Sequence, residues 1–213
     1  MGLLNRLTPR KTEPDVLPSP SVVDDPVFAT KALRKFLTTL TARESPVLLD
    51  LGPVVGSNVS FFGEQLGCKI IVEDIFADLD RHVREGKLEV FPEFLKKRFP
   101  EETSSVDGIL CWDVIDYMDK AAALELAKEL TRLLRPDGAL LAFFGSVPRP
   151  DVRYTKYIIV DEVNLKYRTY QAARGRQAVF LNRDIIRLFA GLRVSDSFLL
   201  QNNLREILFR KPA

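Results

Sequence analysis

The stretch that decides the fold is Val47-Leu-Leu-Asp-Leu-Gly-Pro-Val-Val-Gly56. It begins with an apolar run of strand length and ends in a turn that holds two glycines. Such a run is typical of a parallel strand that is buried on both faces. The turn after it lies at the carboxyl end of the sheet, where open α/β sheets bind ligands. We therefore predict that residues 47–56 are the first strand and the nucleotide-facing turn of a Rossmann-like α/β domain.

Strand and helix patterns alternate along the chain after this segment. Strands are expected at 69–72, 88–91, 108–112 and 139–144, and helices at 57–66, 78–85 and 120–134. This alternation predicts a mostly parallel sheet with helices on both faces, which is a three-layer α/β fold. Further strands are expected at 156–161, 165–170, 195–201 and 205–210, with a helix at 182–189. The last two strands predict a hairpin that closes the sheet with an antiparallel strand.

The N-terminal part has a different composition. Residues 8–26 hold five of the 13 prolines, so we expect residues 1–26 to be a flexible arm and residues 27–213 to be one domain. An apolar stripe predicts a helix over 27–42, with Asp25 as its cap and Pro26 at its first position.

Composition narrows the class of protein. With 213 residues, 46% of them apolar, the chain can bury one proper core. The net charge of +2 gives no global attraction to nucleic acid or to an anionic membrane. No apolar run reaches the roughly 18–20 residues that a membrane span needs. Two distant cysteines, Cys68 and Cys111, predict no metal site and no disulfide framework, so we expect a cytoplasmic protein.

Two ligand classes use a glycine-rich turn of this kind. Dinucleotide enzymes need Gly-x-Gly-x-x-Gly, and a reading from Gly52 matches one of the three glycines, which disfavours an NAD-dependent oxidoreductase. The segment from Asp50 to Gly56 instead resembles the Asp/Glu-x-Gly-x-Gly-x-Gly motif of class I S-adenosylmethionine-dependent methyltransferases. It has the acid and two of the three glycines. Val54 replaces the middle glycine and adds bulk beside the expected ligand.

Three further segments agree with this family in order and spacing. Residues 70–75 resemble its second strand, whose terminal carboxylate binds the two ribose hydroxyls, and Asp74 aligns better than Glu73. Residues 105–114 resemble its fourth strand, and residues 134–138 resemble the turn before its fifth. The resemblance covers residues 47–145 and, more loosely, 190–212.

The resemblance implies a Rossmann-like methyltransferase sheet with S-adenosylmethionine as the cofactor. The cofactor-binding residues that it implies are Asp50, Gly52, Pro53, Gly56, Glu73, Asp74, Ile75, Cys111 and Asp113. Plainer interpretations stay open for several of them. The two glycines could form a strand-to-helix turn without a ligand, and Asp74 could be a helix N-cap. Trp112, beside Cys111, is expected to pack in the core.

Residues 149–187 stand out by charge and aromatic content. They hold nine Arg or Lys against four Asp or Glu, and four of the five tyrosines. We interpret this segment as an inserted hairpin or lid that shapes the acceptor site. A solvated hairpin and a homodimer contact are the alternatives. Cations interleaved with aromatics also leave nucleic acid open as a partner, though we do not favour it.

Methyl transfer from a sulfonium needs alignment and exclusion of water more than acid–base groups. We accordingly assign no catalytic residue, and we expect His82, the single histidine, to lie on the surface among charged neighbours. The chain also lacks the Asn/Asp-Pro-Pro-Tyr/Phe signature of amide and base methylation after the fourth strand. The leading hypothesis is therefore a methyltransferase with a small-molecule acceptor. The alternative, suggested by Val54 and the missing catalytic residues, is an inactive methyltransferase-like binding or assembly module.

Overall fold

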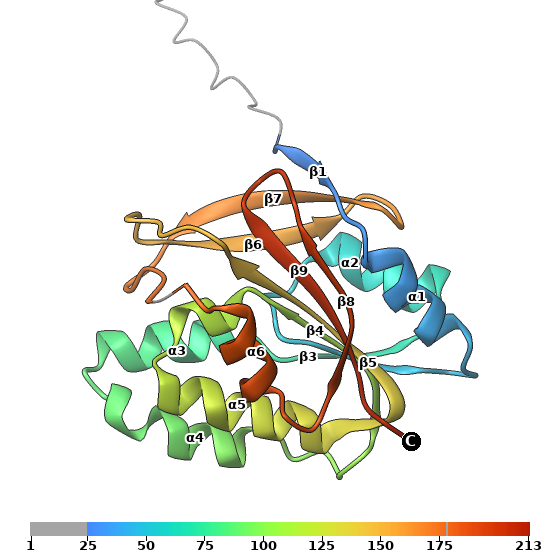
Figure 1. Ribbon diagram of the computed structural model, residues 1–213, viewed down its shortest axis with the longest axis horizontal. Helices are drawn as coiled ribbons and strands as arrows, with labels where there is room; N and C mark the ends of the chain where they lie inside the picture. Colours follow the sequence, from blue (N-terminus) through green and yellow to red (C-terminus); the bar gives the residue numbers. More distant parts are fainter. Residues whose placement is uncertain (1–24, 178) are drawn as a thin grey trace, which may run out of the picture.

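A computed structural model describes residues 25–177 and 179–213, and it contains two sheets (Figure 1). The larger sheet has six strands in the order β3-β2-β4-β5-β9-β8. Its strands are β2 (Val47–Asp50), β3 (Lys69–Val72), β4 (Val106–Trp112), β5 (Leu134–Gly145), β8 (Arg193–Leu199) and β9 (Leu204–Arg210). The first four in spatial order are parallel, whereas β9 runs antiparallel to β5 and to β8. This confirms the predicted mostly parallel sheet with an antiparallel C-terminal hairpin.

Helices cover both faces of this sheet. One face packs against α1 (Leu33–Thr41) and α2 (Gly56–Ser60), which continues as a π-helical turn, Phe61–Gln65. The other face packs against α3 (Ile75–Arg84), α4 (Phe91–Arg98), α5 (Lys120–Leu133) and α6 (Asn182–Leu188). Alternate side chains of β4 enter the two cores in turn, as the pleat of a strand requires. The result is the predicted three-layer arrangement.

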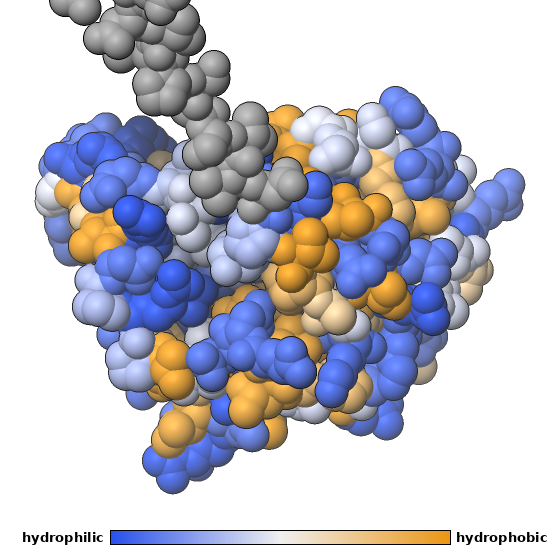
Figure 2. All heavy atoms as spheres, turned by 90° about the horizontal axis from the view of Figure 1, so that it is seen from above, coloured by the Kyte–Doolittle hydropathy of each residue, from blue (hydrophilic) through white to orange (hydrophobic). Residues whose placement is uncertain are grey.

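A second, three-stranded antiparallel sheet lies across the top of the molecule in Figure 1. It consists of β1 (Val27–Ala29), β7 (Asn164–Gln171) and β6 (Arg153–Ile159), in that order. The β6–β7 pair is the hairpin that was predicted within residues 149–187. Figure 2 shows the molecule from above, the side on which the small sheet lies, and hydrophobic residues are interspersed there among hydrophilic ones.

The predicted helix over 27–42 is wrong in its first part. Val27–Ala29 is a strand that pairs with β7, and the helix begins at Leu33. Asp25 does not cap that helix but forms an ion pair with Arg168 of β7, 2.6 Å away. The partner strand lies more than a hundred positions along the chain, so local periodicity could not reveal the pairing. Residues 1–24 of the predicted arm lie outside the described residues.

The predicted strand at 88–91 is also wrong. Leu88–Val90 forms a 3₁₀ turn, and α4 begins directly after it with Pro92 in its first turn, where proline is favoured. The misplaced element explains a second error. His82 is buried rather than solvated, because its ring packs between the rings of Phe91 and Phe94, at centroid distances of 4.9 and 4.8 Å.

Most other elements begin and end within about three residues of the predicted positions, but β5 begins at Leu134, five residues before its predicted start. Gly67, with a φ of 65°, ends the helical segment after the glycine turn, as expected for a left-handed residue at a helix C-terminus. α3 begins three residues earlier than predicted, at Ile75. Within the described residues, no helix is both long and apolar enough to cross a membrane.

Candidate functional site

The glycine turn lies where the strand order of the large sheet reverses. β2 pairs with β3 on one side and with β4 on the other, and Asp50 stands opposite Val72 and Leu110. The carboxyl ends of the three strands therefore lie side by side. Ligands of open α/β sheets bind in the crevice at such a point, so the register of the sheet places the turn as the sequence predicted.

Asp50 is the buried acid at the end of β2. Its Oδ1 accepts hydrogen bonds from the Gly52 N–H at 2.9 Å and from the Trp112 Nε1–H at 2.6 Å. Burial raises the pKa of this carboxyl to about 6, although both hydrogen bonds favour the ionised form. Asp50 therefore binds the turn and the end of β4 together rather than facing an open space.

Trp112 closes the space above the turn. Its backbone has a φ of 49°, a left-handed conformation that is rare for a bulky residue. The indole lies so close to Gly52 that an added Cβ there would be 2.9 Å from Cδ1 of the ring. The ring also stacks on Tyr157 of β6, with centroids 5.2 Å apart and planes 12° apart. Gly52 is thus required by the close approach of an aromatic ring.

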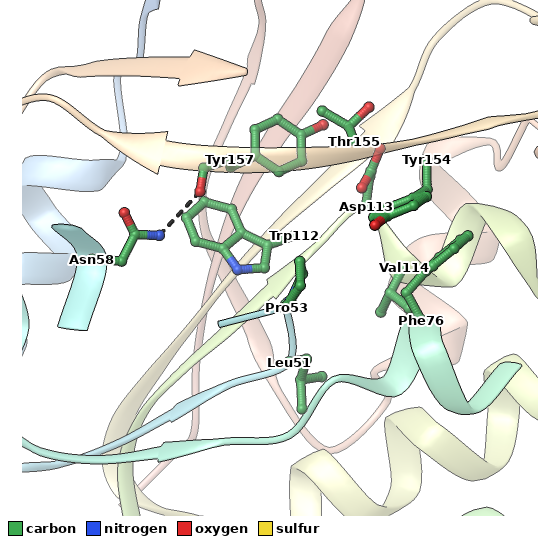
Figure 3. A pocket seen from close by; sticks show the side chains of 11 residues that line it. Leu51, Pro53, Asn58, Phe76, Trp112, Asp113, Val114, Tyr154, Thr155 and Tyr157 are labelled. Atoms are coloured by element: carbon green, nitrogen blue, oxygen red, sulfur yellow. Dashed lines mark hydrogen bonds between the residues drawn. The ribbon is translucent and has the colours of Figure 1, made fainter. Parts of the chain in front are cut away.

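Asn58 connects the turn's helix to the small sheet. The side chain projects from α2 and is 3% exposed. Its Nδ2 donates to the Tyr157 carbonyl at 3.0 Å (Figure 3). Its Oδ1 accepts from the Ile159 N–H at 2.8 Å. Both polar ends of the amide are therefore satisfied by the backbone of β6, which fixes Tyr157 above Trp112.

The residues after β3 mostly have structural partners. Asp74 caps α3, its Oδ1 accepting from the Ala77 N–H at 2.9 Å, and partial burial raises its pKa. This is the N-cap that the sequence left open as an alternative. Glu73 pairs with Arg98 at 2.5 Å, and the Ile75 side chain is fully buried in the core.

At the end of β4, neighbouring side chains point in different directions. Cys111 is fully buried in the core beneath α3 and α5, where burial raises the pKa of its thiol. The structure therefore does not bring the Cys111 side chain to the site. Asp113 lines a small cavity that begins beside Gly52 and Pro53, and its carboxylate pairs with Arg176 Nη2 at 2.5 Å.

Arg176 is a buried cation that sequence reasoning did not single out. It follows β7, its side chain is 8% exposed, and its Nη1 also lies 3.5 Å from Asp116 Oδ2. That oxygen accepts from the Gly145 N–H at 2.7 Å, yet burial raises the pKa of Asp116 to about 8. Both carboxyl groups therefore face the same guanidinium, and Asp113 is the nearer of the two. The feature of the sequence that pointed towards Arg176 was the excess of basic residues in the segment 149–187, which contains it.

Two cavities lie beneath the small sheet. The first, about 20 Å³, runs from Gly52 and Pro53 past Trp112 to Phe76 and Asp113 (Figure 3). The second, about 330 Å³, lies further along β6 towards the ends of β5 and β9. It is lined by Val147, Arg149, Thr155, Tyr157, Tyr167, Arg176, Asn202, Asn203 and Leu204. Thr155 and Tyr157 border both cavities, so the two are separated by side chains of one strand.

S-adenosylmethionine does not fit the first cavity in this arrangement. A space of about 20 Å³ holds about one water molecule, whereas small-molecule pockets measure roughly 300–1,000 Å³. The Val54 side chain is 69% exposed and does not line this cavity, so the expectation that it crowds a bound ligand stays a prediction. Gly56 is not crowded, since a Cβ there would have no neighbour within 4 Å. Trp112 and Tyr157 fill the space instead.

No protein-family model and no curated protein matches the sequence. Among solved structures, the chain is similar to the PH0226 protein from Pyrococcus horikoshii OT3, at 18% identity and a TM-score of 0.50, covering 85% of this chain and 92% of that one. It is also similar to the CcbJ methyltransferase from Streptomyces caelestis, at 11% identity and a TM-score of 0.50, covering 84% and 95%. At these identities the likeness is one of fold. Together with the strand order and the antiparallel C-terminal hairpin, it shows that the chain has a Rossmann-like fold, like that of the CcbJ methyltransferase.

Proposed function

We propose that the chain is an S-adenosylmethionine-dependent methyltransferase that acts on a small-molecule acceptor. The observation that carries this proposal is the position of the glycine turn. It lies at the reversal point of a methyltransferase-like sheet, with carboxylates at the ends of two adjacent strands, Asp50 and Asp74. A ligand in the crevice at such a point would pass Gly52 and reach Asp74 with its ribose.

The bound cofactor would supply a methyl group that its sulfonium already activates. The residues of this chain would then have to hold the acceptor and exclude water. The small sheet is suited to the second task, because β6 covers both cavities. We therefore propose residues 149–187 as a lid. Since the cofactor does not fit beside Trp112 and Tyr157 as they lie, the proposal requires these side chains to move.

The second cavity supports a small molecule as the acceptor. Its volume of about 330 Å³ is within the range of small-ligand sites. Two tyrosine rings and two guanidinium groups line it, so it offers flat apolar surface together with hydrogen-bond donors. Nucleic acid as a partner, a homodimer through the Tyr- and Arg-rich hairpin, and a cytoplasmic location stay predictions.

A second candidate is a methyltransferase-like module that binds a partner without turnover. The observation that favours it is the closed first cavity, which holds about one water molecule. The two candidates differ in one measurable property, the affinity for the demethylated cofactor.

Calorimetric titration with S-adenosylhomocysteine tests the proposal. We expect micromolar binding by the wild-type protein. Asp74→Ser retains an oxygen that can cap α3 but lacks the carboxylate, so it should weaken binding at least tenfold while leaving stability nearly unchanged. Glu102→Ser, which removes an exposed carboxylate before the start of β4, is the control. Wild-type protein that releases no heat at millimolar ligand would favour the module instead.

A further inference from the structure

We propose that Trp112 and Tyr157 form an aromatic gate over the glycine turn, that Asn58 holds this gate closed, and that cofactor binding displaces the Trp112 ring. This inference rests on the proposed function and deepens it. On this proposal, the first cavity is small because the gate is closed, and the cofactor site itself is intact.

The indole occupies the place that a ligand at the turn would take. It lies against Gly52 on one side and against the ring of Tyr157 on the other. The remaining cavity of about 20 Å³ continues from this point towards Phe76 and Asp113. The first cavity therefore has polar and aromatic walls along its course, and at the turn it is closed by the Trp112 indole.

Trp112 is held in its position at a cost to the backbone. A φ of 49° is unfavourable for a bulky residue, and such conformations persist only where the surroundings impose them. Here the surroundings include a register shift in the β4–β5 pairing between Leu110 and Trp112, together with the hydrogen bond to Asp50 and the stack on Tyr157. Rotation of the indole away from the turn would break both side-chain contacts. Residues held in this way are typical of sites that switch.

Asn58 is the latch of the gate. Its amide makes two buried hydrogen bonds with the backbone of β6, at Tyr157 and Ile159. Among the described residues, no other side chain forms a hydrogen bond with these two backbone groups. Removing the amide would leave the carbonyl and the N–H without their partner, and both would gain from exposure to water. The Asn58→Ala variant should therefore favour the open gate.

The chain contains a single tryptophan, so its fluorescence reports on the gate alone. In the ligand-free wild type we expect a blue-shifted emission that acrylamide quenches weakly, because the indole is 5% exposed. Addition of S-adenosylhomocysteine should change the emission maximum and increase quenching severalfold. Asn58→Ala should show increased quenching without ligand. Its affinity should rise at least fivefold, because a larger share of the molecules is then competent to bind.

Two further variants sharpen the test. Trp112→Phe retains a ring but loses the donor to Asp50, so calorimetry should show tighter binding than in the wild type. Asn182→Ala changes an exposed asparagine of α6, far from the gate, and should leave both quenching and affinity unchanged.

The outcomes separate the gate from the proposed function. Tight binding by the wild type with unchanged tryptophan emission and quenching overturns the gate and leaves the proposed function standing. Equal quenching in ligand-free wild type and Asn58→Ala overturns the latch, whatever the ligand does. Absence of binding in the wild type, Asn58→Ala and Trp112→Phe overturns the proposed function, and with it the ligand-driven opening.

Discussion

Replacing Asp50 by Asn should change the pH dependence of stability in a defined direction. Burial raises the pKa of this carboxyl from 3.8 to about 6. Between these two values the folded state keeps the proton that the unfolded state releases. The free energy of unfolding therefore falls as the pH rises through this window. The stabilisation is fully present below about pH 4 and is lost above about pH 6.

The magnitude follows from the size of the shift. A difference of about 2 pKa units corresponds to about 3 kcal/mol, at about 1.4 kcal/mol per unit. Asn has nearly the same shape as Asp, and its carbonyl oxygen can still accept from the Gly52 N–H and the Trp112 Nε1–H. The variant should therefore keep the local contacts and lose only the titration.

Urea unfolding of both proteins between about pH 4 and about pH 7.5, followed by tryptophan fluorescence, measures this effect. Relative to the wild type, Asp50→Asn should gain about 2–2.5 kcal/mol between the two ends of the range, because the full shift of about 3 kcal/mol is reached only well below pH 4. Other carboxyls with raised pKa values, such as Asp116, titrate in both proteins and cancel in the difference. Parallel stability profiles for the two proteins would refute the reasoning.

The remaining predictions concern packing and the buried ion pair. Gly52→Ala should lower the free energy of unfolding in urea by about 1–3 kcal/mol, because its Cβ would lie 2.9 Å from the indole. The control Gly56→Ala, whose Cβ would have nothing within 4 Å, should change this free energy by less than about 0.5 kcal/mol. Equal costs for the two variants would contradict the close packing at Gly52. Arg176→Met should cost about 3–5 kcal/mol, because it leaves the Asp113 carboxylate buried without its cation. Adding Asp113→Asn to Arg176→Met should recover much of that loss in the same measurement, and an additive double variant would argue against the pairing.

Local sequence signals identified the six strands of the large sheet, although they also predicted a strand at 88–91 where the chain forms a 3₁₀ turn. The apolar run 47–51 and the glycines after it identified β2 and its turn, and the last two strand patterns identified the antiparallel hairpin. These features depend on residues that are close in sequence. The errors have the opposite origin. Val27–Ala29 is extended because of a partner strand far along the chain, and His82 is buried because α4 covers it.

The candidate site was predictable in its position but not in its contents. The residues Gly52, Pro53 and Asp113, singled out from the sequence, do line the cavity. Trp112 is buried, as the sequence predicted, but the sequence could not show that its ring lies against Gly52, because the ring reaches this place through a left-handed backbone and a stack on a distant strand. Arg176 was missed for the same reason, since its partner Asp113 lies far away in the sequence.

The small sheet has a consequence for the order of folding. Its edge strand β1 pairs Val27 with Lys166, so the two halves of the covering sheet come from distant parts of the chain. Closing so long a loop is entropically costly, and contacts of this kind form late. We expect the large sheet to assemble first and the β1–β7 pairing to complete the molecule. A chain shortened from its N-terminus past residue 26 would lose β1 residues. We expect it to have a disturbed small sheet over the site, while the α/β core still forms.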